Sequence, residues 1–336
     1  MRIAIRAVRT TPETSLIFTD EKTATAVEWP TLIICAICYM GFAIATIYAQ
    51  ALGPVITLAI LTLTLTLFSS FNHEVLHGHP FRNELANTVL VFPALGLLIP
   101  YPRFRDTHLA HHHDPSLTDP YDDPETNFID PAVWLTWSAP RKWLYYWNNT
   151  LLGRMVIGPV IGLATFYAQD FRAVLAGDRE VARAYVFHGV ALVPVVWWLS
   201  TFGALPLWVY FLAVYLSHSI LKIRTFLEHC AHEKARCRSV IIEDRGPLSF
   251  LFLKNNLHAL HHARPKLPWY QLDACYAASR DRILTRNGGY AYRSYAQVAR
   301  LFLTRAKDPV PHVLWDVPQD APEETAQPQH PETAVS

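Results

Sequence analysis

Charged residues are scarce in this chain. Asp, Glu, Lys and Arg make up 17% of its 336 residues, whereas hydrophobic residues make up 51%. Soluble domains usually contain about a quarter of charged residues, so the composition predicts a membrane protein. The formal net charge is +1, which gives no electrostatic basis for binding nucleic acid.

Cysteines are also few, and their spacing indicates no disulfide framework. The chain has 5 of them, an odd number. Cys35 and Cys38 have the C-x-x-C spacing of some metal sites, but no second pair accompanies them. They lie in an apolar run, and free cysteine behaves as a small hydrophobic residue. We therefore expect both to pack among apolar side chains.

The N-terminal segment, residues 1–30, lacks the short apolar stretch and small-residue cleavage site of a signal peptide. The first apolar run is therefore predicted to be an uncleaved membrane span. Four such runs are long enough to cross a bilayer: residues 31–51, 55–71, 184–202 and 205–223. Breaks at Gly53-Pro54 and Gly203-Ala204 arrange them as two helical hairpins. Two other apolar stretches, 88–101 and 151–168, are shorter or interrupted and are expected to be re-entrant or interfacial.

The distribution of basic residues predicts the orientation. Neither hairpin turn, 51–54 or 203–204, carries Lys or Arg. Basic residues concentrate on the cytoplasmic side of membrane proteins, so both termini and the middle segment are expected there. Residues 31–307 would form one membrane domain. Residues 308–336 are rich in Pro, Glu, Gln and Thr and are expected to be a disordered tail.

Histidines form three clusters on the predicted cytoplasmic side. On a helix, positions i, i+3 and i+4 share one face, and neutral imidazole is the commonest metal ligand in proteins. So many imidazoles exceed the four ligands of a structural zinc site, whereas two metals with four or five ligands each would fit. The residues thus indicate a dinuclear site without selecting the metal, because imidazole suits Zn, Cu, Fe and Ni. The clusters are His73-Glu74-Val75-Leu76-His77, His108-Leu109-Ala110-His111-His112-His113 and His258-Ala259-Leu260-His261-His262.

The remaining histidines have more ordinary expectations. His188 and His218 lie inside predicted spans, where polar groups usually hydrogen-bond between helices. His312 and His330 lie in or near the tail and are expected to be solvated. Three further histidines lie next to the clusters, where they would support the ligands or be exposed: His79, His113 and His232.

Two other stretches near the clusters permit two interpretations each. One or two carboxylates of an acidic loop are expected to accept the distal N–H of ligand imidazoles, the alternative being a solvated turn. That loop contains Asp119, Asp122, Asp123 and Glu125. An aromatic stretch over residues 134–147, which includes several Trp and Tyr beside Arg141 and Lys142, would line an acyl-chain tunnel or form an interfacial belt.

The histidine boxes resemble those of the membrane-bound fatty acid desaturase and hydroxylase superfamily. HEVLH at 73–77, HLAHH at 108–112 and HALHH at 258–262 occur in the family's order, with two spans between the second and third boxes. Arg224-Thr-x-x-Glu228-His229 and the Asn255-Asn256-Leu257 lead-in also match, and the resemblance covers about residues 30–275. It implies an all-α integral membrane protein with about four spans and a cytosolic helical cap that holds a di-iron site. The ligands it implies are His73, His77, His108, His111, His112, His229, His258, His261 and His262.

The resemblance also implies a reaction. A member of this superfamily would use two iron ions and O₂ to introduce a double bond into a lipid acyl chain. No His-Pro-Gly-Gly motif of a fused cytochrome b5 domain is present, so electrons would come from a separate donor of the ferredoxin or cytochrome b5 type. In a bacterium the protein would lie in the inner membrane. A hydroxylase or ketolase on the same scaffold, acting on a fatty acid, sphingolipid or carotenoid, is the nearest alternative.

Other classes of protein remain open at this point. His73-Glu74-Val75-Leu76-His77 also has the H-E-x-x-H pattern of zinc proteases, in which the glutamate is the general base. That interpretation leaves the two later His-x-x-His-His boxes unexplained. A metal transporter or haem-binding protein would need ionisable groups within the spans, where His188 and His218 are the candidates.

Overall fold

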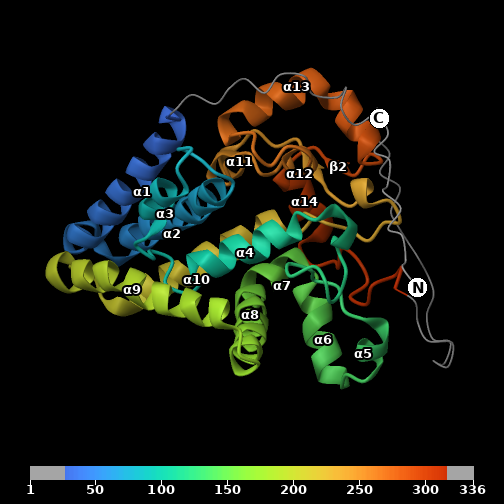
Figure 1. Cartoon of the computed structure of the whole chain (residues 1–336), viewed down its shortest axis with the longest axis horizontal. Helices are drawn as coiled ribbons and strands as arrows, with labels where there is room; N and C mark the ends of the chain where they lie inside the picture. Colours follow the sequence, from blue (N-terminus) through green and yellow to red (C-terminus); the bar gives the residue numbers. More distant parts are fainter. Residues whose placement is uncertain (1–26, 316–336) are drawn as a thin grey trace, which may run out of the picture.

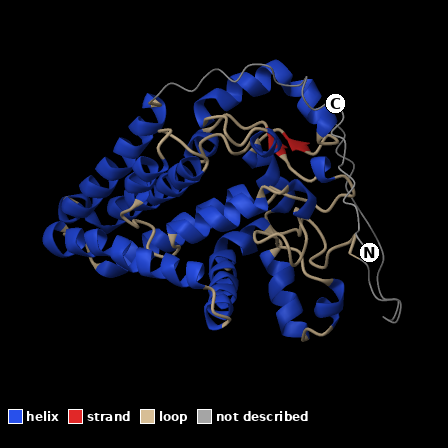
Figure 2. Cartoon of the chain, viewed as in Figure 1, coloured by secondary structure: helices blue, strands red, loops and turns tan. Residues whose placement is uncertain are grey.

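Helices form nearly all of the regular secondary structure among the described residues, as the sequence predicts (Figures 1 and 2). The computed structural model describes residues 27–315. The predictions for most of the N-terminal segment, for the tail beyond residue 315 and for His330 lie outside the described residues. The helices of ten residues or more are α1 (Trp29–Ile47), α2 (Ala49–Leu76), α4 (Tyr101–His111), α6 (Ala139–Asn148), α8 (Gly158–Leu175), α9 (Arg179–Phe202), α10 (Leu207–Thr225) and α13 (Trp269–Arg286).

Short elements connect and cap these helices. The helical ones are α3 (Glu84–Val91), η2 (Asp114–Ser116), α5 (Pro131–Leu135), α7 (Leu151–Val156), η3 (Ala235–Cys237), α11 (Pro247–Leu251), α12 (His258–Ala263) and α14 (Tyr295–Phe302). Two strands of two residues each, β1 (Ile241–Ile242) and β2 (Ala291–Tyr292), pair in parallel.

Three of the described helices are long and apolar enough to cross a membrane, namely α1, α2 and α9. The fourth expected span corresponds to α10, which is not among them. Its second half carries His218, Lys222 and Arg224, and these polar residues lower its apolar content. α10 nevertheless packs against α2 and α7 inside the helical bundle. By length and composition, three of the four predicted spans are therefore confirmed.

The α1–α2 hairpin contains the predicted Gly-Pro break. Gly53 has φ 73° and ψ 164°, outside the helical region, and Pro54 follows it. Beyond this break α2 continues to Leu76, past the predicted end at residue 71, and so includes the first histidine box except His77, which is the C-cap of the helix. Cys35 and Cys38 are buried in the core between these helices, as expected.

One side of α9 is apolar and exposed. Val186, Val190, Val193 and Trp197 recur at intervals of three and four residues and are 53–69% exposed. A helix face of this kind on a helix of spanning length is typical of contact with lipid. The N-terminus of α9 is capped by the side chain of Asp178, which accepts two backbone N–H groups.

The two interrupted apolar stretches are not spans. Within residues 88–101, α3 ends at Val91 and an irregular loop follows, in which the Ala94 N–H donates to the Ala191 carbonyl of α9. The stretch 151–168 is expected as one interfacial helix but forms two, α7 and α8, because the backbone breaks at Ile157 between them.

A buried ion pair fixes α4 against α8. Arg103 on α4 donates from Nε and Nη2 to the carboxylate of Asp170 on α8, with its shortest contact at 2.7 Å. The same carboxylate accepts the hydroxyl of Tyr185 on α9 at 3.0 Å. Asp170 is 2% exposed. This pairing sets the position of the helix that carries the second histidine box.

The third box is held by the small cap around the two strands. The Ala259 N–H of α12 donates to the Val240 carbonyl at 2.8 Å, next to β1. Leu257 and Leu260 are buried against Ile241 and residues of α13. This cap adjoins the α1–α2 hairpin, since α11 packs against α2, and Figure 1 shows α11 next to α2.

Candidate metal centre

All nine histidines that the resemblance assigns to the metal site lie together. They form two groups, in each of which one ring nitrogen per residue lies within 4.8 Å of the others. The first histidine group consists of His73, His77, His108, His112 and His261. The second histidine group consists of His111, His229, His258 and His262.

Helix periodicity explains this division. Residues four apart share a helix face, and each such pair joins one group: 73 with 77, 108 with 112, and 258 with 262. His111 and His261 are the remaining members of their boxes and point to the other group. α4 and α12 each therefore contribute ligands to both groups, which holds the groups side by side.

The nitrogen positions fit bound metal ions. Within the groups, neighbouring Nε2 atoms lie 2.9–3.2 Å apart, in the pairs His111–His229, His229–His258, His108–His112 and His112–His261. Two imidazole nitrogens each about 2.1 Å from one ion, at right angles, would lie about 3.0 Å apart. Nε2 of His73 and of His77 is buried without a hydrogen-bond partner among the described residues. Since no thiol belongs to either group, the donor set suits a metal that prefers imidazole.

Two carboxylates of the acidic loop orient histidines of α4, as predicted. His108 Nδ1 donates to Glu125 at 3.0 Å, and His111 Nδ1 donates to Asp123 at 2.7 Å. Donation from Nδ1 leaves Nε2 free to bind a metal. The other two acidic residues of the loop, Asp119 and Asp122, do not contact the histidines.

Two further supporting residues were not predicted as such. Ser239 Oγ lies 3.2 Å from His229 Nδ1, and Asn255 Oδ1 lies 3.1 Å from His258 Nδ1. Asn255 belongs to the lead-in of the third box, so its spacing offered a signal. No sequence signal identified Ser239, because only the antiparallel bridge between residues 229 and 239 brings it next to His229.

The electrostatic surroundings keep most of these rings neutral. Burial and neighbouring imidazoles hold the pKa of His258 and of His261 well below the ordinary value. His111 differs: burial lowers its pKa, but Glu125, Asp123 and Glu228 outweigh burial and raise it to about 9. Neutral imidazole is the form that binds metal, so a metal ion would displace a proton at His111.

Histidines next to the boxes lie outside both groups. His79 is buried and its Nδ1 lies 2.8 Å from Glu28, so it ties the segment before α1 to the loop after α2. His113 and His232 are exposed, in agreement with one of the two expectations for them.

The other isolated histidines are structural, but each of the three differs from expectation. His188 Nε2 donates to the Leu97 carbonyl at 2.8 Å, which joins α9 to a loop. His218 does not join two helices, because its Nδ1 donates to the Val214 carbonyl of its own helix. His312 was expected to be solvated but is 6% exposed, with Nε2 3.1 Å from Thr118 Oγ1. Residues 309–315 pack against the acidic loop here, which the composition alone did not indicate.

Glu74 does not belong to either histidine group. Its carboxylate accepts the backbone N–H of Trp269 at 3.1 Å and is 4% exposed. It thereby anchors the start of α13 on the end of α2. A zinc protease would need this glutamate at the metal, so the arrangement argues against the H-E-x-x-H interpretation.

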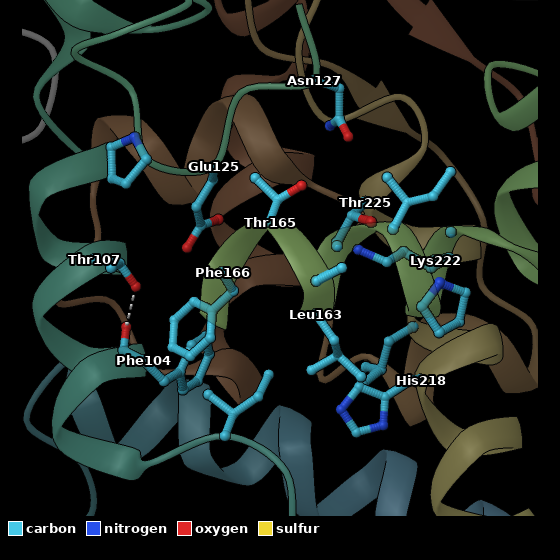
Figure 3. A pocket seen from close by; sticks show the side chains of 18 of the residues that line it. Phe104, Thr107, Glu125, Asn127, Leu163, Thr165, Phe166, His218, Lys222 and Thr225 are labelled. Carbon is cyan, nitrogen blue, oxygen red and sulfur yellow. Dashed lines mark hydrogen bonds between the residues drawn. The ribbon is translucent and has the colours of Figure 1, made fainter. Parts of the chain in front are cut away.

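A cavity of about 850 Å³ adjoins the second histidine group. His111 and His229 form part of its wall, and much of the remainder is apolar, including Phe68, Leu163 and Phe166. Figure 3 shows Leu163 and Phe166 of α8 facing the cavity together with Glu125. Its volume is within the range of about 300–1,000 Å³ usual for small-molecule sites.

The aromatic stretch 134–147 is divided between the cavity wall and the exposed surface. Trp137 and Tyr145 line the cavity, and Arg141 lies 3.7 Å over the Trp137 ring. Trp143 points away and is 67% exposed, as expected for an interfacial residue.

Comparison with known families agrees with this arrangement. The fatty acid desaturase family model matches residues 29–295, which is most of the chain. A search of curated proteins finds no match. The match of the family model shows that the chain belongs to the fatty acid desaturase family. It is a membrane-bound oxidoreductase of that family.

Proposed function

We propose that this protein is an O₂-dependent di-iron desaturase that introduces a double bond into a lipid acyl chain. The observation that carries the proposal is the division of nine imidazoles into two adjacent groups beside a mostly apolar cavity. The first group offers five nitrogens and the second four, enough for one ion each. Two bound irons would supply the activation of O₂ for removal of hydrogen from the chain.

The residues of the chain would hold and shield this centre. Asp123 and Glu125 fix the orientation of His111 and His108, so each presents Nε2 to its group. The apolar wall of the cavity would position an acyl chain and keep water from it. Electrons would come from an external donor of the ferredoxin or cytochrome b5 type.

We further propose that α10 also crosses the membrane, as the fourth span, so that the centre and both termini face the cytoplasm. The support is the distribution of charge: the α1–α2 and α9–α10 turns lack Lys and Arg, whereas the segments that carry the histidine boxes are rich in both.

Lipid profiling tests the reaction. The chain would be expressed in a host with a ferredoxin-type donor, beside a His261→Ala variant that removes a ligand of the first group. A wild-type-dependent lipid lighter by two hydrogens is the expected result. A product heavier by one oxygen atom would identify a hydroxylase or ketolase instead, and an unchanged profile with fully loaded metal would contradict the proposal.

A further inference from the structure

Each carboxylate in the cavity wall already has a basic partner. Each of the four contacts a basic partner at 2.7–3.2 Å: Asp123 with His111, Glu125 with His108, Glu228 with Arg224, and Asp308 with Lys307. None of them forms an ion pair with two other basic residues of that wall, the buried Arg154 and the half-buried Lys222.

Arg154 and Lys222 thus form no ion pair with a carboxylate among the described residues, although Glu125 and Glu228 attract Lys222, and Asp308 attracts Arg154, from beyond ion-pair distance. Arg154 is 3% exposed and donates only to neutral groups, the Asn148 carbonyl at 2.9 Å and the side chain of Asn127. Lys222 makes no hydrogen bond or ion pair within residues 27–315. Their positive charges repel each other, and a buried cation is costly unless an anion compensates it.

Two glycines of α8 make room for these side chains. Gly158 and Gly162 are four residues apart and share a helix face. A Cβ on Gly158 would lie 2.9 Å from Arg154 Cδ, and one on Gly162 would lie 3.2 Å from Lys222 Nζ. Figure 3 shows the Lys222 side chain extending into the cavity near Thr225. Both cations are therefore accommodated against α8 and directed to the same chamber.

We propose that Lys222 and Arg154 form an anion-binding subsite that receives the acidic group of the substrate. The inference rests on the proposed function and adds a substrate class: an acyl chain whose carboxylate or phosphate enters the chamber next to the second histidine group. An ammonium and a guanidinium donate charge-assisted hydrogen bonds to such oxygens. An uncharged ester of the same chain would leave both cations unpaired.

Binding measured without turnover tests this subsite. The purified full-length protein in detergent would be titrated with a brominated long-chain fatty acid, its methyl ester and the alkyl phosphate of the same chain. Quenching of tryptophan fluorescence reports occupancy, since Trp137 lines the cavity. Wild type should bind an anionic probe about tenfold or more tightly than the ester. The tighter of the two anions identifies carboxylate or phosphate as the natural group.

Three variants locate the effect. Lys222→Met keeps the length of the side chain without its charge and should lose the preference for anions, with ester binding unchanged. Gly162→Ala favours the helix but crowds the Lys222 ammonium, and it should weaken the same preference. Lys234→Met changes an exposed lysine outside the cavity and should bind like wild type.

The outcome is independent of the desaturase assay. Equal affinity of wild type for the ester and both anions would overturn the subsite, as would an undiminished preference in Lys222→Met. A protein with the preference but without lipid products would keep the subsite and refute the reaction.

Discussion

Consecutive histidines of the second box have very different surroundings. His108 and His111 are each 2% exposed and hydrogen-bonded to carboxylates, and His112 joins the first histidine group. His113 is exposed and belongs to neither group. The cluster 108–113 thus contains three candidate ligands and one histidine outside the site, although the four look equivalent in the sequence.

Alanine substitutions along this cluster should distinguish the ligands from His113. His108→Ala, His111→Ala and His112→Ala are each expected to abolish lipid modification and lower the bound metal, because each removes one nitrogen of a group. His113→Ala should keep metal content and most activity. Metal analysis of the purified variants, with lipid profiles of the same cells, measures both. Equal losses at all four positions would show that the ligand assignment is wrong.

The carboxylates behind the histidines allow a second test at this scale. Asp123→Asn weakens the acceptor for His111 without changing its size, and supporting partners of this kind are worth about 10–100-fold in metal affinity or activity. Asp122→Asn is the matched control, since Asp122 is exposed in the same loop. Metal retained against a chelator is the measurement. Indistinguishable variants would mean that Asp123 does not support the site.

At the scale of helices, the position of α4 depends on one buried carboxylate. Removing Asp170 by substitution with Ala would leave Arg103 unpaired, and breaking a buried pair costs about 3–5 kcal/mol. We expect a lower unfolding temperature in detergent and reduced metal content, because α4 contributes ligands to both groups. The exposed i,i+3 pair of Glu180 and Arg183 supplies a control: Glu180→Ala should unfold like wild type. A fully stable Asp170→Ala variant would contradict this role for the pair.

The helices also show what the sequence could and could not predict. Spacing of i and i+4 predicted that pairs such as His73 and His77 act together, and apolar runs located α1, α2 and α9. The spacing could not tell which pairs share a metal, because that depends on how α2, α4 and α12 pack. Ser239 was missed for the same reason, since only chain pairing after α10 places it beside His229.

The two cations of the cavity wall, Lys222 and Arg154, were another feature that spacing could not predict. Lys222 appears in the sequence as the end of an apolar run, and Arg154 as an interruption of another. Their shared cavity depends on the fit of α8 against α7 and α10, which involves glycines at two positions. Local patterns thus located the histidine groups well and the cavity poorly.

For the whole molecule, the structure links a lipid-facing bundle to a histidine-rich cap. The exposed apolar side of α9 suits the membrane, and the two histidine groups lie where α2, α4, α12 and the chain after α10 converge. The cavity adjoins the second histidine group and is lined mainly by helices of the bundle and by the acidic loop. Substrate from the membrane and electrons from a soluble donor could therefore meet at one centre.

The metal content of the purified protein tests the central claim most directly. Two histidine groups with separate ligands predict about two iron ions per chain, and loss of a ligand from either group, as in His261→Ala or His258→Ala, should lower that number. One zinc ion per chain, unaffected by substitutions in the second group, would contradict the account.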